Sequence, residues 1–210
     1  MTGLQAMDIL LPLAAFLLGG VPFGVILARA NGVDLRKTGS GNIGATNVLR
    51  SVGKTAALFT LLGDIFKGTA AVLVGRYFGH GPHAAAVMGL FAVLGHDFSP
   101  FMGFKGGKGV ATSLGVLLGL SPAVGVFSML LWIAAAFAAK YSSLSALTVF
   151  LFLPLNVWIV DYRLLHCDNP DRMALAFALS ILLFFKHRDN IGRLINGTEP
   201  KMGSGKSKIK

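Results

Sequence analysis

The sequence predicts an all-α integral membrane protein with about seven transmembrane helices, and two observations lead to this prediction. Of the 210 residues, 54% are hydrophobic and only 13% are charged, whereas charged residues make up about a quarter of an ordinary soluble domain. The mean hydropathy is strongly positive, at +0.68. Because so few polar residues cannot cover so much apolar surface in a soluble fold, a lipid bilayer is the expected solvent.

Seven apolar stretches are long enough, or nearly long enough, to cross a bilayer as helices, which takes about 20 residues each. In chain order they are Ile9–Ala28, Ala56–Gly75, Ala84–Leu94 with an extension towards Phe98, Val110–Leu120, Pro122–Ala139, Leu144–Val160 and Met173–Phe185. The first is interpreted as a span and not as a cleaved signal peptide, because no Lys or Arg precedes it.

Positive charge decides how the stretch Val110–Ala139 is divided. It fits one long helix or two helices separated at Ser121 and Pro122, and proline after serine favours a turn. Lys67 lies inside a span in either case; with the break, 15 of the 19 Lys and Arg residues fall on one side of the membrane, whereas without it the other 18 divide nine against nine. Since cytoplasmic loops carry the excess of positive charge, the sequence favours seven spans, an outside N-terminus and a cytoplasmic C-terminus.

Several other classes of chemistry are not expected. Cys167 is the only cysteine, and no Cys/His cluster has the spacing of a metal site, so we predict no metal, no cofactor and no nucleic-acid partner. The net charge of +10 favours anionic partners. Residues 1–199 are predicted to form a single membrane-embedded domain. The lysine-rich residues 200–210 are predicted to form a disordered tail that touches anionic lipid.

Three polar segments fall on the predicted cytoplasmic face, and the first is Gly39–Arg50. Glycine lets backbone N–H groups converge on an anion, and the Arg50 guanidinium can bind two phosphate oxygens at once. The glycine spacing also matches a dinucleotide fingerprint, but that fingerprint needs a preceding strand, and this segment follows a predicted membrane helix. The candidate anion-binding residues are Ser40, Gly41, Asn42, Gly44, Thr46, Asn47 and Arg50.

The second segment, Gly103–Thr112, leads into the short predicted helix Val110–Leu120. Lysines among glycines at a helix N-terminus combine ammonium charge, free N–H groups and the positive end of the helix dipole. The candidate phosphate-binding residues are Lys105, Gly106, Gly107, Lys108 and Gly109. The ending Gly-Lys-Ser/Thr of a Walker A loop is missing. Since eleven helical residues rise only about 16 Å, we expect this loop to dip towards the membrane interface.

The third segment, Lys186–Glu199, follows the last predicted span. If that helix continues, His187, Asn190 and Arg193 share one of its faces. A histidine beside an anion site can bind a phosphate or move a proton near neutral pH. The alternative, a positively charged stop after the membrane helix, explains the basic residues but not His187 or Asn190.

Two further pairs of residues require interpretation. Asp64 and Lys67 lie within the second predicted span, where an ionisable residue is a functional candidate by default. We favour an internal pair, or contacts that fix the loop after the first span. His166 and Asp171 match the His-x4-Asp signature of acyltransferases that use acyl-CoA or acyl carrier protein. The predicted topology places them outside, away from the three polar segments, so we discount this match.

The three segments together closely resemble those of the bacterial acyl-phosphate:glycerol-3-phosphate acyltransferases, the PlsY family. The matching strings are Gly39–Asn47 with Arg50, Phe104–Thr112, and His187–Leu194 with Gly197 and Glu199. The resemblance implies transfer of a fatty acyl group from acyl phosphate to the 1-position of sn-glycerol 3-phosphate, which gives lysophosphatidic acid and phosphate. It implies an enzyme of phospholipid biosynthesis in the bacterial inner membrane, with its active site on the cytoplasmic side.

The resemblance also implies roles for single residues. It ties the residues Ser40, Arg50, His187 and Asn190 to activity. It ties the loop Lys105–Gly109 to binding glycerol 3-phosphate, and Glu199 to structural integrity. A serine after the fifth span is implied near the substrate phosphate. Both Ser142 and Ser143 fit that position, and we favour Ser143.

The residues themselves are compatible with direct acyl transfer. Acyl phosphate has a good leaving group, and the sequence offers no cysteine nucleophile or evident Ser-His-Asp triad near the site, so we hypothesise that the glycerol hydroxyl attacks the acyl carbon directly. The alternative function is a transporter of a phosphorylated or anionic solute. It predicts an internal repeat and polar groups on the outer face, and the sequence shows neither. A lipid scaffold would leave the glycines and His187 unexplained.

Overall fold

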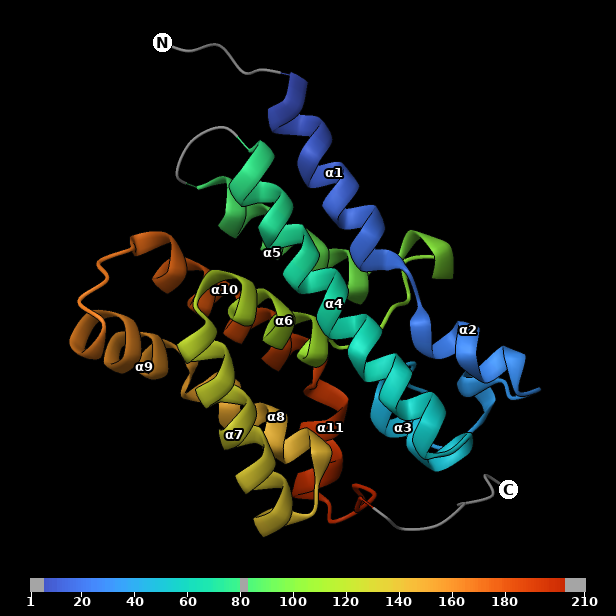
Figure 1. Cartoon of the computed structure of the whole chain (residues 1–210). Helices are drawn as coiled ribbons and strands as arrows, with labels where there is room; N and C mark the ends of the chain where they lie inside the picture. The colour runs from blue at the N-terminus through green and yellow to red at the C-terminus, as the bar shows by residue number, and fades with distance from the viewer. Residues whose placement is uncertain (1–5, 80–82, 203–210) are drawn as a thin grey trace.

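The computed structural model describes residues 6–79 and 83–202, and every regular element within these ranges is helical (Figure 1). The α-helices are α1 (Ala6–Gly20), α2 (Phe23–Ala30), α3 (Ala45–Ser51), α4 (Lys54–Phe78), α5 (Ala84–Asp97), α6 (Val110–Leu120), α7 (Pro122–Ala139), α8 (Ser142–Leu151), α9 (Leu153–Val157), α10 (Pro170–Lys186) and α11 (Arg188–Ile195). Leu35–Lys37 and Pro100–Met102 form 3₁₀ turns, and Trp158–Leu164 forms a π-helical segment. The predicted tail falls mostly on residues 203–210, which lie outside the described residues.

Four helical segments in the described ranges are long and apolar enough to cross a bilayer. They are Ala6–Ala30, Lys54–Phe78, Ala84–Met102 and Pro122–Ala139, and a bent pair of helices from Ser142 to Leu164 makes a fifth candidate. The all-α membrane class is thereby confirmed. The number of seven spans stays a prediction, because α6 has 11 residues and α10 has 17, fewer than the 20 or so that a span normally needs. The orientation of the termini also stays a prediction.

The first predicted span, Ile9–Ala28, is interrupted at Val21 and Pro22, which separate α1 from α2. Proline has no backbone N–H and disrupts a helix interior, so this is where the helical hydrogen-bond pattern changes. The Val21 carbonyl is left accessible and accepts a hydrogen bond from Lys67 Nζ on α4, at 3.1 Å. Lys67 therefore contacts the interruption within the first predicted span, and not the loop after that span.

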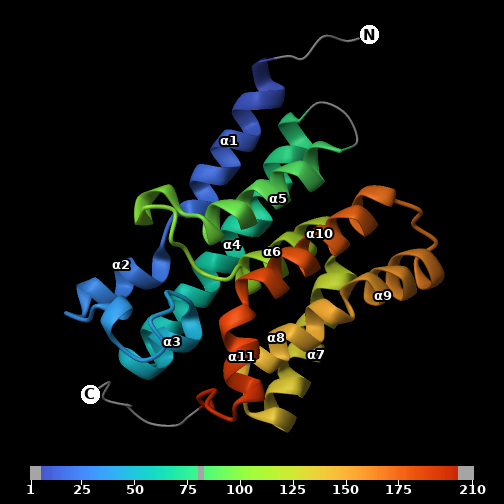
Figure 2. The same cartoon turned by 180° about the vertical axis from the view of Figure 1, so that it is seen from behind.

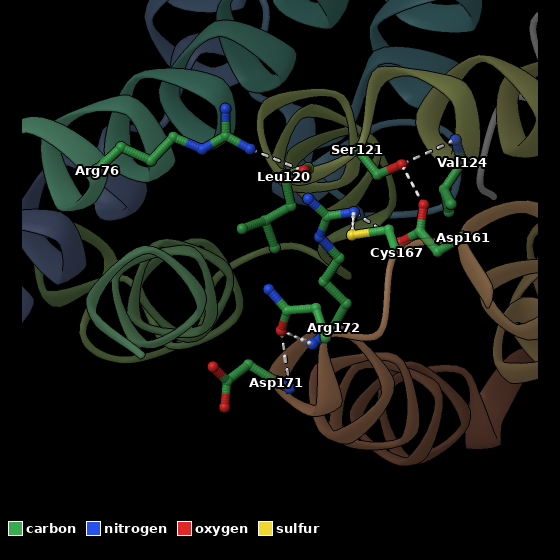
Figure 3. Close-up of polar contacts among 9 residues, drawn as sticks. Arg76, Leu120, Ser121, Val124, Asp161, Cys167, Asp171 and Arg172 are labelled. Atoms are coloured by element: carbon green, nitrogen blue, oxygen red, sulfur yellow. Dashed lines mark hydrogen bonds and ion pairs between the residues drawn. The ribbon is translucent and has the colours of Figure 1, made fainter. Parts of the chain in front are cut away.

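The predicted break at Ser121 is confirmed: α6 ends at Leu120 and α7 begins at Pro122. Ser121 caps α7, because its Oγ accepts from the backbone N–H of Val124 at 3.5 Å. The same hydroxyl donates to Asp161 at 2.7 Å (Figure 3). Proline at the first helical position needs no N–H partner, so this serine and proline start a new helix at little cost.

The predicted span Leu144–Val160 is present as a bent pair of helices and not as one straight helix. The helix starts at Ser142, breaks after Leu151 and bends by 52°. The reason is Pro154, which removes the N–H that would bond to the carbonyl of Phe150 four residues earlier. That carbonyl instead accepts from the Ser180 hydroxyl on α10, at 2.6 Å.

The last helix does not continue past Lys186, so the expectation of a single helix carrying His187, Asn190 and Arg193 is also wrong. At His187 the backbone leaves the helical conformation, with φ −100° and ψ 7°, and α11 begins one residue later. Figures 1 and 2 show α11 turned away from the direction of α10. The turn brings α11 to the end of the molecule where α3 also lies.

Glycines allow the central helices to approach closely, as in other membrane bundles. A Cβ added to Gly68 of α4 would lie 2.2 Å from the Thr112 carbonyl oxygen of α6. A Cβ on Gly115 of α6 would lie 2.0 Å from the Ile65 carbonyl oxygen of α4. Only glycine fits at such distances, so α4 and α6 are held backbone to backbone. This contact fixes the first turn of α6 against α4.

Candidate active site

A cavity of about 430 Å³ brings together residues from all three polar segments. Its wall combines two kinds of lining. Apolar side chains come from α4, α6 and α7 and include Leu61, Leu114 and Trp132. The polar side chains are Ser40, Asn42, Thr46, Asn47, Arg50, Asp64, His96, Lys108, Ser142, Ser143, His187, Asn190 and Glu199.

The first segment is organised around the buried amide of Asn47. Its Nδ2 donates to the carbonyls of Asn42 at 2.8 Å and Thr38 at 3.0 Å, and its Oδ1 accepts from the backbone N–H of Ser40 at 2.9 Å. Gly39 has φ +63°, and a Cβ there would lie 2.1 Å from Asn47 Oδ1. Asn47 therefore shapes the loop that presents Ser40, with its hydrogen-bonding groups already used inside the protein.

Arg50 lies in the last turn of α3 and is half-buried at the cavity wall. One terminal nitrogen donates to the backbone carbonyls of Pro200 at 3.0 Å and Lys201 at 3.2 Å. Its Nε is buried and has no partner among the described residues. Burial lowers the pKa of the guanidinium, and the nearby carboxylate of Glu199 opposes this shift. Arg50 stays cationic and has donors left for an anion.

The second segment is attached to the C-terminal end of α5. The backbone N–H of Gly106 donates to the Asp97 carbonyl at 3.2 Å, and that of Gly107 donates to the His96 carbonyl at 2.9 Å. A Cβ on Gly106 would lie 1.9 Å from the His96 oxygen, which explains the glycine. Lys105 is exposed, and its carbonyl accepts from Arg36. Of this segment, Lys108, Gly109, Val110 and Ala111 line the cavity.

Lys108 is the cation of the second segment that faces the cavity. Its ammonium donates to the side-chain oxygen of Asn190 on α11. Burial, followed by the positive charge of Arg193, lowers the pKa of Lys108 to about 8. Gly109, with φ +71°, precedes the first turn of α6, so the ammonium and the N-terminus of a helix dipole lie together. Both favour an anion at this position.

Glu199 connects the third segment to α8. Its Oε1 accepts from Ser143 Oγ at 2.6 Å and from Asn190 Nδ2 at 2.7 Å, and its Oε2 accepts from Arg193 Nε at 2.7 Å. Burial alone would raise the pKa of this carboxyl, but the hydrogen bonds from Ser143, Asn190 and Arg193 outweigh burial and hold it below its usual value. The ionised Glu199 therefore orients Asn190 towards Lys108.

His187 is buried between α10 and α11 and lines the cavity. Its Nδ1 lies 3.0 Å from the Leu183 carbonyl oxygen, so Nδ1 carries the hydrogen and Nε2 is left as an acceptor. Burial, followed by the charge of Lys108, lowers the pKa of His187 to about 4. At neutral pH the imidazole is therefore uncharged, with a free acceptor nitrogen, as a general base requires.

The two candidate serines after α7 have different partners. The Ser142 hydroxyl lies 2.9 Å from the Thr46 hydroxyl, which links α8 to the first segment. The Ser143 hydroxyl donates to Glu199. Both line the cavity, and neither of these hydrogen bonds involves His187. The geometry thus gives Ser142 and Ser143 separate places in the site.

Four predicted site residues do not line the cavity, and one polar lining residue was not predicted. The predicted residues Gly41, Lys105, Gly106 and Gly107 are not among the cavity residues, whereas His96, which the sequence analysis did not single out, is one of them. The signal that could have found it is its position at the end of the third predicted span, shortly before the second segment. Within residues 6–79 and 83–202, no three His, Cys, Asp or Glu residues are placed to hold a metal ion.

The remaining predicted pairs have clear positions. Asp64 and Lys67 form the expected internal pair, with Oδ1 and Nζ 2.8 Å apart. Asp171 does not act with His166: its carboxylate lies 2.5 Å from the ring of His83, and neither member of the His-x4-Asp match lines the cavity.

Fold and cavity together define a helical membrane protein with cationic and amide groups beside an apolar wall, which is the environment of an enzyme that handles phosphorylated lipids. A family model described as Glycerol-3-phosphate acyltransferase matches residues 9–197. The chain belongs to this family.

Curated relatives and solved structures agree with this assignment. A glycerol-3-phosphate acyltransferase of Agrobacterium fabrum is 49% identical over 208 residues, which cover 97% of each chain. One from Mesorhizobium japonicum is 50% identical over 190 residues, or 90% of this chain and 93% of the relative. Two crystal structures of PlsY (YgiH), described as an integral membrane glycerol 3-phosphate acyltransferase in a glycerol 3-phosphate form and a lysophosphatidic acid form, are also similar. The glycerol 3-phosphate form has a TM-score of 0.84 and 38% identity, and the match covers 93% of this chain and 96% of that chain. The lysophosphatidic acid form has a TM-score of 0.83 and 37% identity, and the match covers 93% of this chain and 95% of that chain.

Proposed function

We propose that this chain transfers a fatty acyl group from acyl phosphate to the 1-hydroxyl of sn-glycerol 3-phosphate, and so produces lysophosphatidic acid and phosphate. The observation that carries the proposal is the cavity itself: Arg50, Lys108 and the neutral His187 face the same space as an apolar wall. The first two groups suit phosphates, and the wall suits an acyl chain. The glycerol 3-phosphate and lysophosphatidic acid forms of the solved relative add support.

The reaction proceeds by direct attack. The glycerol oxygen forms a bond to the acyl carbon, the bond between that carbon and the phosphate oxygen breaks, and inorganic phosphate leaves with the electron pair. The proton of the hydroxyl passes to His187 Nε2 or to a phosphate oxygen. The Ser142 hydroxyl is paired with Thr46, and the Ser143 hydroxyl donates to Glu199, which Asn190 and Arg193 also bind, so neither serine has the histidine partner of a Ser-His pair.

Positioning and charge neutralisation supply most of the rate. Two phosphates repel each other, and Arg50 and Lys108 offset that repulsion by lying on the same cavity wall. Ser40, Asn42 and Thr46 line the same cavity and offer amide and hydroxyl groups. Asn190 and Glu199 hold Lys108 in place. Holding both reactants within bonding distance converts a bimolecular step into an effectively unimolecular one.

The enzyme works in the bacterial inner membrane with its active site on the cytoplasmic side. Seven spans, an outside N-terminus and a cytoplasmic C-terminus place Arg50, Lys108 and the third segment on that side. Support comes from the gathering of α3 and α11 at one end of the molecule (Figures 1 and 2) and from the predicted distribution of 15 of the 19 Lys and Arg residues. Residues 1–199 form the catalytic domain, Pro200 and Lys201 are attached to it through Arg50, and the lysines that follow supply charge suited to anionic lipid.

Turnover by the purified protein tests the proposal. Protein in detergent, supplied with acyl phosphate and glycerol 3-phosphate, should produce lysophosphatidic acid detectable by mass spectrometry, and acyl-CoA should not replace acyl phosphate. No product, together with uptake of a phosphorylated solute into vesicles, would favour a transporter instead. A stable acyl adduct on Ser40 would rule out direct attack.

A further inference from the structure

Three ionisable side chains lie buried beside the cavity, outside the three polar segments. They are Asp64 and Lys67 of α4 and His96 of α5, and their side chains are 4%, 1% and 6% exposed. Lys67 Nζ lies 2.8 Å from Asp64 Oδ1, 2.8 Å from His96 Nδ1 and 3.1 Å from the Val21 carbonyl oxygen. The cluster therefore connects α4, α5 and the loop between α1 and α2.

The hydrogen-bonding capacity of Lys67 fixes the tautomer of His96. An ammonium has three hydrogens and no lone pair, and Lys67 meets three acceptors. His96 Nδ1 must accept one of these hydrogens, so the ring carries its own hydrogen on Nε2. The charge of Lys67 is balanced by Asp64. The cluster therefore presents a neutral N–H donor whose orientation is fixed by buried contacts.

This donor is next to the phosphate-binding loop. A Cβ on Gly107 would lie 2.1 Å from His96 Nε2, so the ring edge touches the backbone of the second segment. Within the described part of the chain, none of the hydrogen bonds of His96 involves Nε2. His96 and Asp64 line the cavity together with Lys108. The arrangement places an unused donor at the wall where an anion is expected.

We propose that His96 is a further substrate-binding residue, whose Nε2–H donates to a phosphate oxygen of a substrate held beside Lys108. Asp64 and Lys67 are positioning residues: Lys67 fixes the tautomer and also neutralises a carboxylate that would otherwise repel phosphate. This inference rests on the proposed function, because it needs a phosphorylated substrate in the cavity. It adds a donor on α5 to the three segments that already surround the site.

Two substitutions at His96 separate this role from a purely structural one. His96→Gln places an amide N–H near the position of Nε2, whereas His96→Asn reaches only the position of Nδ1. We expect His96→Asn to raise the KM for glycerol 3-phosphate, or that for acyl phosphate, by about 10- to 100-fold, the range typical of a hydrogen bond to a charged group. His96→Gln should keep that KM within about fivefold of the wild type. Equal losses in both variants would overturn the inference.

Controls keep the outcome interpretable. His83→Asn changes an exposed histidine just before the same helix, at the end away from the cavity, and should leave both KM values unchanged. Melting temperatures in detergent show whether each variant is folded. If His96→Asn does not fold, the double variant Lys67→Met with Asp64→Asn takes its place. It removes the ammonium that fixes the His96 tautomer without leaving an unpaired charge, and it should raise the same KM. An unchanged KM would overturn the inference. Wild-type protein without turnover would instead refute the proposed function.

Discussion

Arg172 at one end of this molecule and Lys108 and Arg50 at the other have different kinds of partner. At the end drawn in Figure 3, Arg172 donates to Asp161 at 2.9 Å, and Asp161, which is fully buried, also accepts from Ser121 at 2.7 Å. At the cavity end, Lys108 contacts the amide of Asn190, and Arg50 contacts backbone carbonyls. Cations paired with a buried carboxylate stabilise the fold. Cations that meet only neutral acceptors keep their charge available for an anionic ligand.

Side chains near Arg172 also stabilise the termini of neighbouring helices. Arg76 donates to the Leu120 carbonyl at the end of α6, at 2.7 Å, and Asn169 accepts from the backbone N–H groups of Asp171 and Arg172 at the start of α10. A small cavity of about 250 Å³ lies there, but its charges are used for ion pairs and caps. The two ends should therefore respond differently to mutation, one by losing activity and the other by losing stability.

The largest expected effect is at His187. His187→Asn keeps a donor near Nδ1 for the Leu183 carbonyl but removes Nε2. We expect kcat to fall by about 10²- to 10⁴-fold, the usual contribution of a general base, with the melting temperature nearly unchanged. Steady-state kinetics on the purified variant measure this. A loss of less than tenfold would assign the proton to a phosphate oxygen instead.

The two lysines of the second segment give a matched comparison. Lys108 faces the cavity and Lys105 is exposed outside it. Lys108→Met should lower kcat/KM by about 10²- to 10³-fold, as expected for a cation that stabilises developing charge, whereas Lys105→Met should lower it by less than about tenfold. Equal losses would show that Lys105 moves into the cavity when substrate binds.

A stability effect is expected at the opposite end. Arg172→Leu leaves the buried carboxylate of Asp161 without its cation, which costs about 2–3 kcal/mol when the arginine is partly exposed. The melting temperature should fall by about 5–10 °C, and kcat/KM per folded molecule should stay near the wild-type value. Adding Asp161→Asn should recover part of the stability. A selective loss of activity would contradict the structural role of this end.

The smallest effect is a pH dependence. The pKa of Lys108 is lowered from its usual value to about 8, and only its protonated form is cationic. Activity should therefore decline as pH rises through about 8, after correction for spontaneous hydrolysis of the donor. Lys108→Arg, which keeps its charge, should remove this decline from the pH profile of kcat/KM. A decline that persists in Lys108→Arg would assign it to another group.

Local patterns predicted the elements whose limits are set by neighbouring residues. The bounds of α6 and α7 follow from Ser121 and Pro122, and the pairing of Asp64 with Lys67 follows from helical spacing. The bend at Phe152 was not predicted, although Pro154 is visible in the sequence. The carbonyl that Pro154 leaves without a helical partner accepts a hydrogen bond from Ser180 on another helix. Contacts between residues far apart in the chain cannot be read from spacing alone.

The same limit applies to the site. Arg50, Lys108 and His187 were predicted because their types and neighbours suit phosphate chemistry. The structural use of Asn47 depends on the folded conformation of its own loop. The position of His96 at the cavity wall depends on how α5 meets the second segment. Sequence patterns therefore identified the charged groups, while the residues that orient them required the packed structure.

A single-turnover experiment tests the central claim most directly. Wild-type protein in excess over acyl phosphate is mixed with glycerol 3-phosphate, and phosphate and lysophosphatidic acid are measured over time. The account predicts that both products form together in equal amounts, and that no phosphate is released when glycerol 3-phosphate is absent. Release of a stoichiometric burst of phosphate without glycerol 3-phosphate would contradict direct transfer in this cavity.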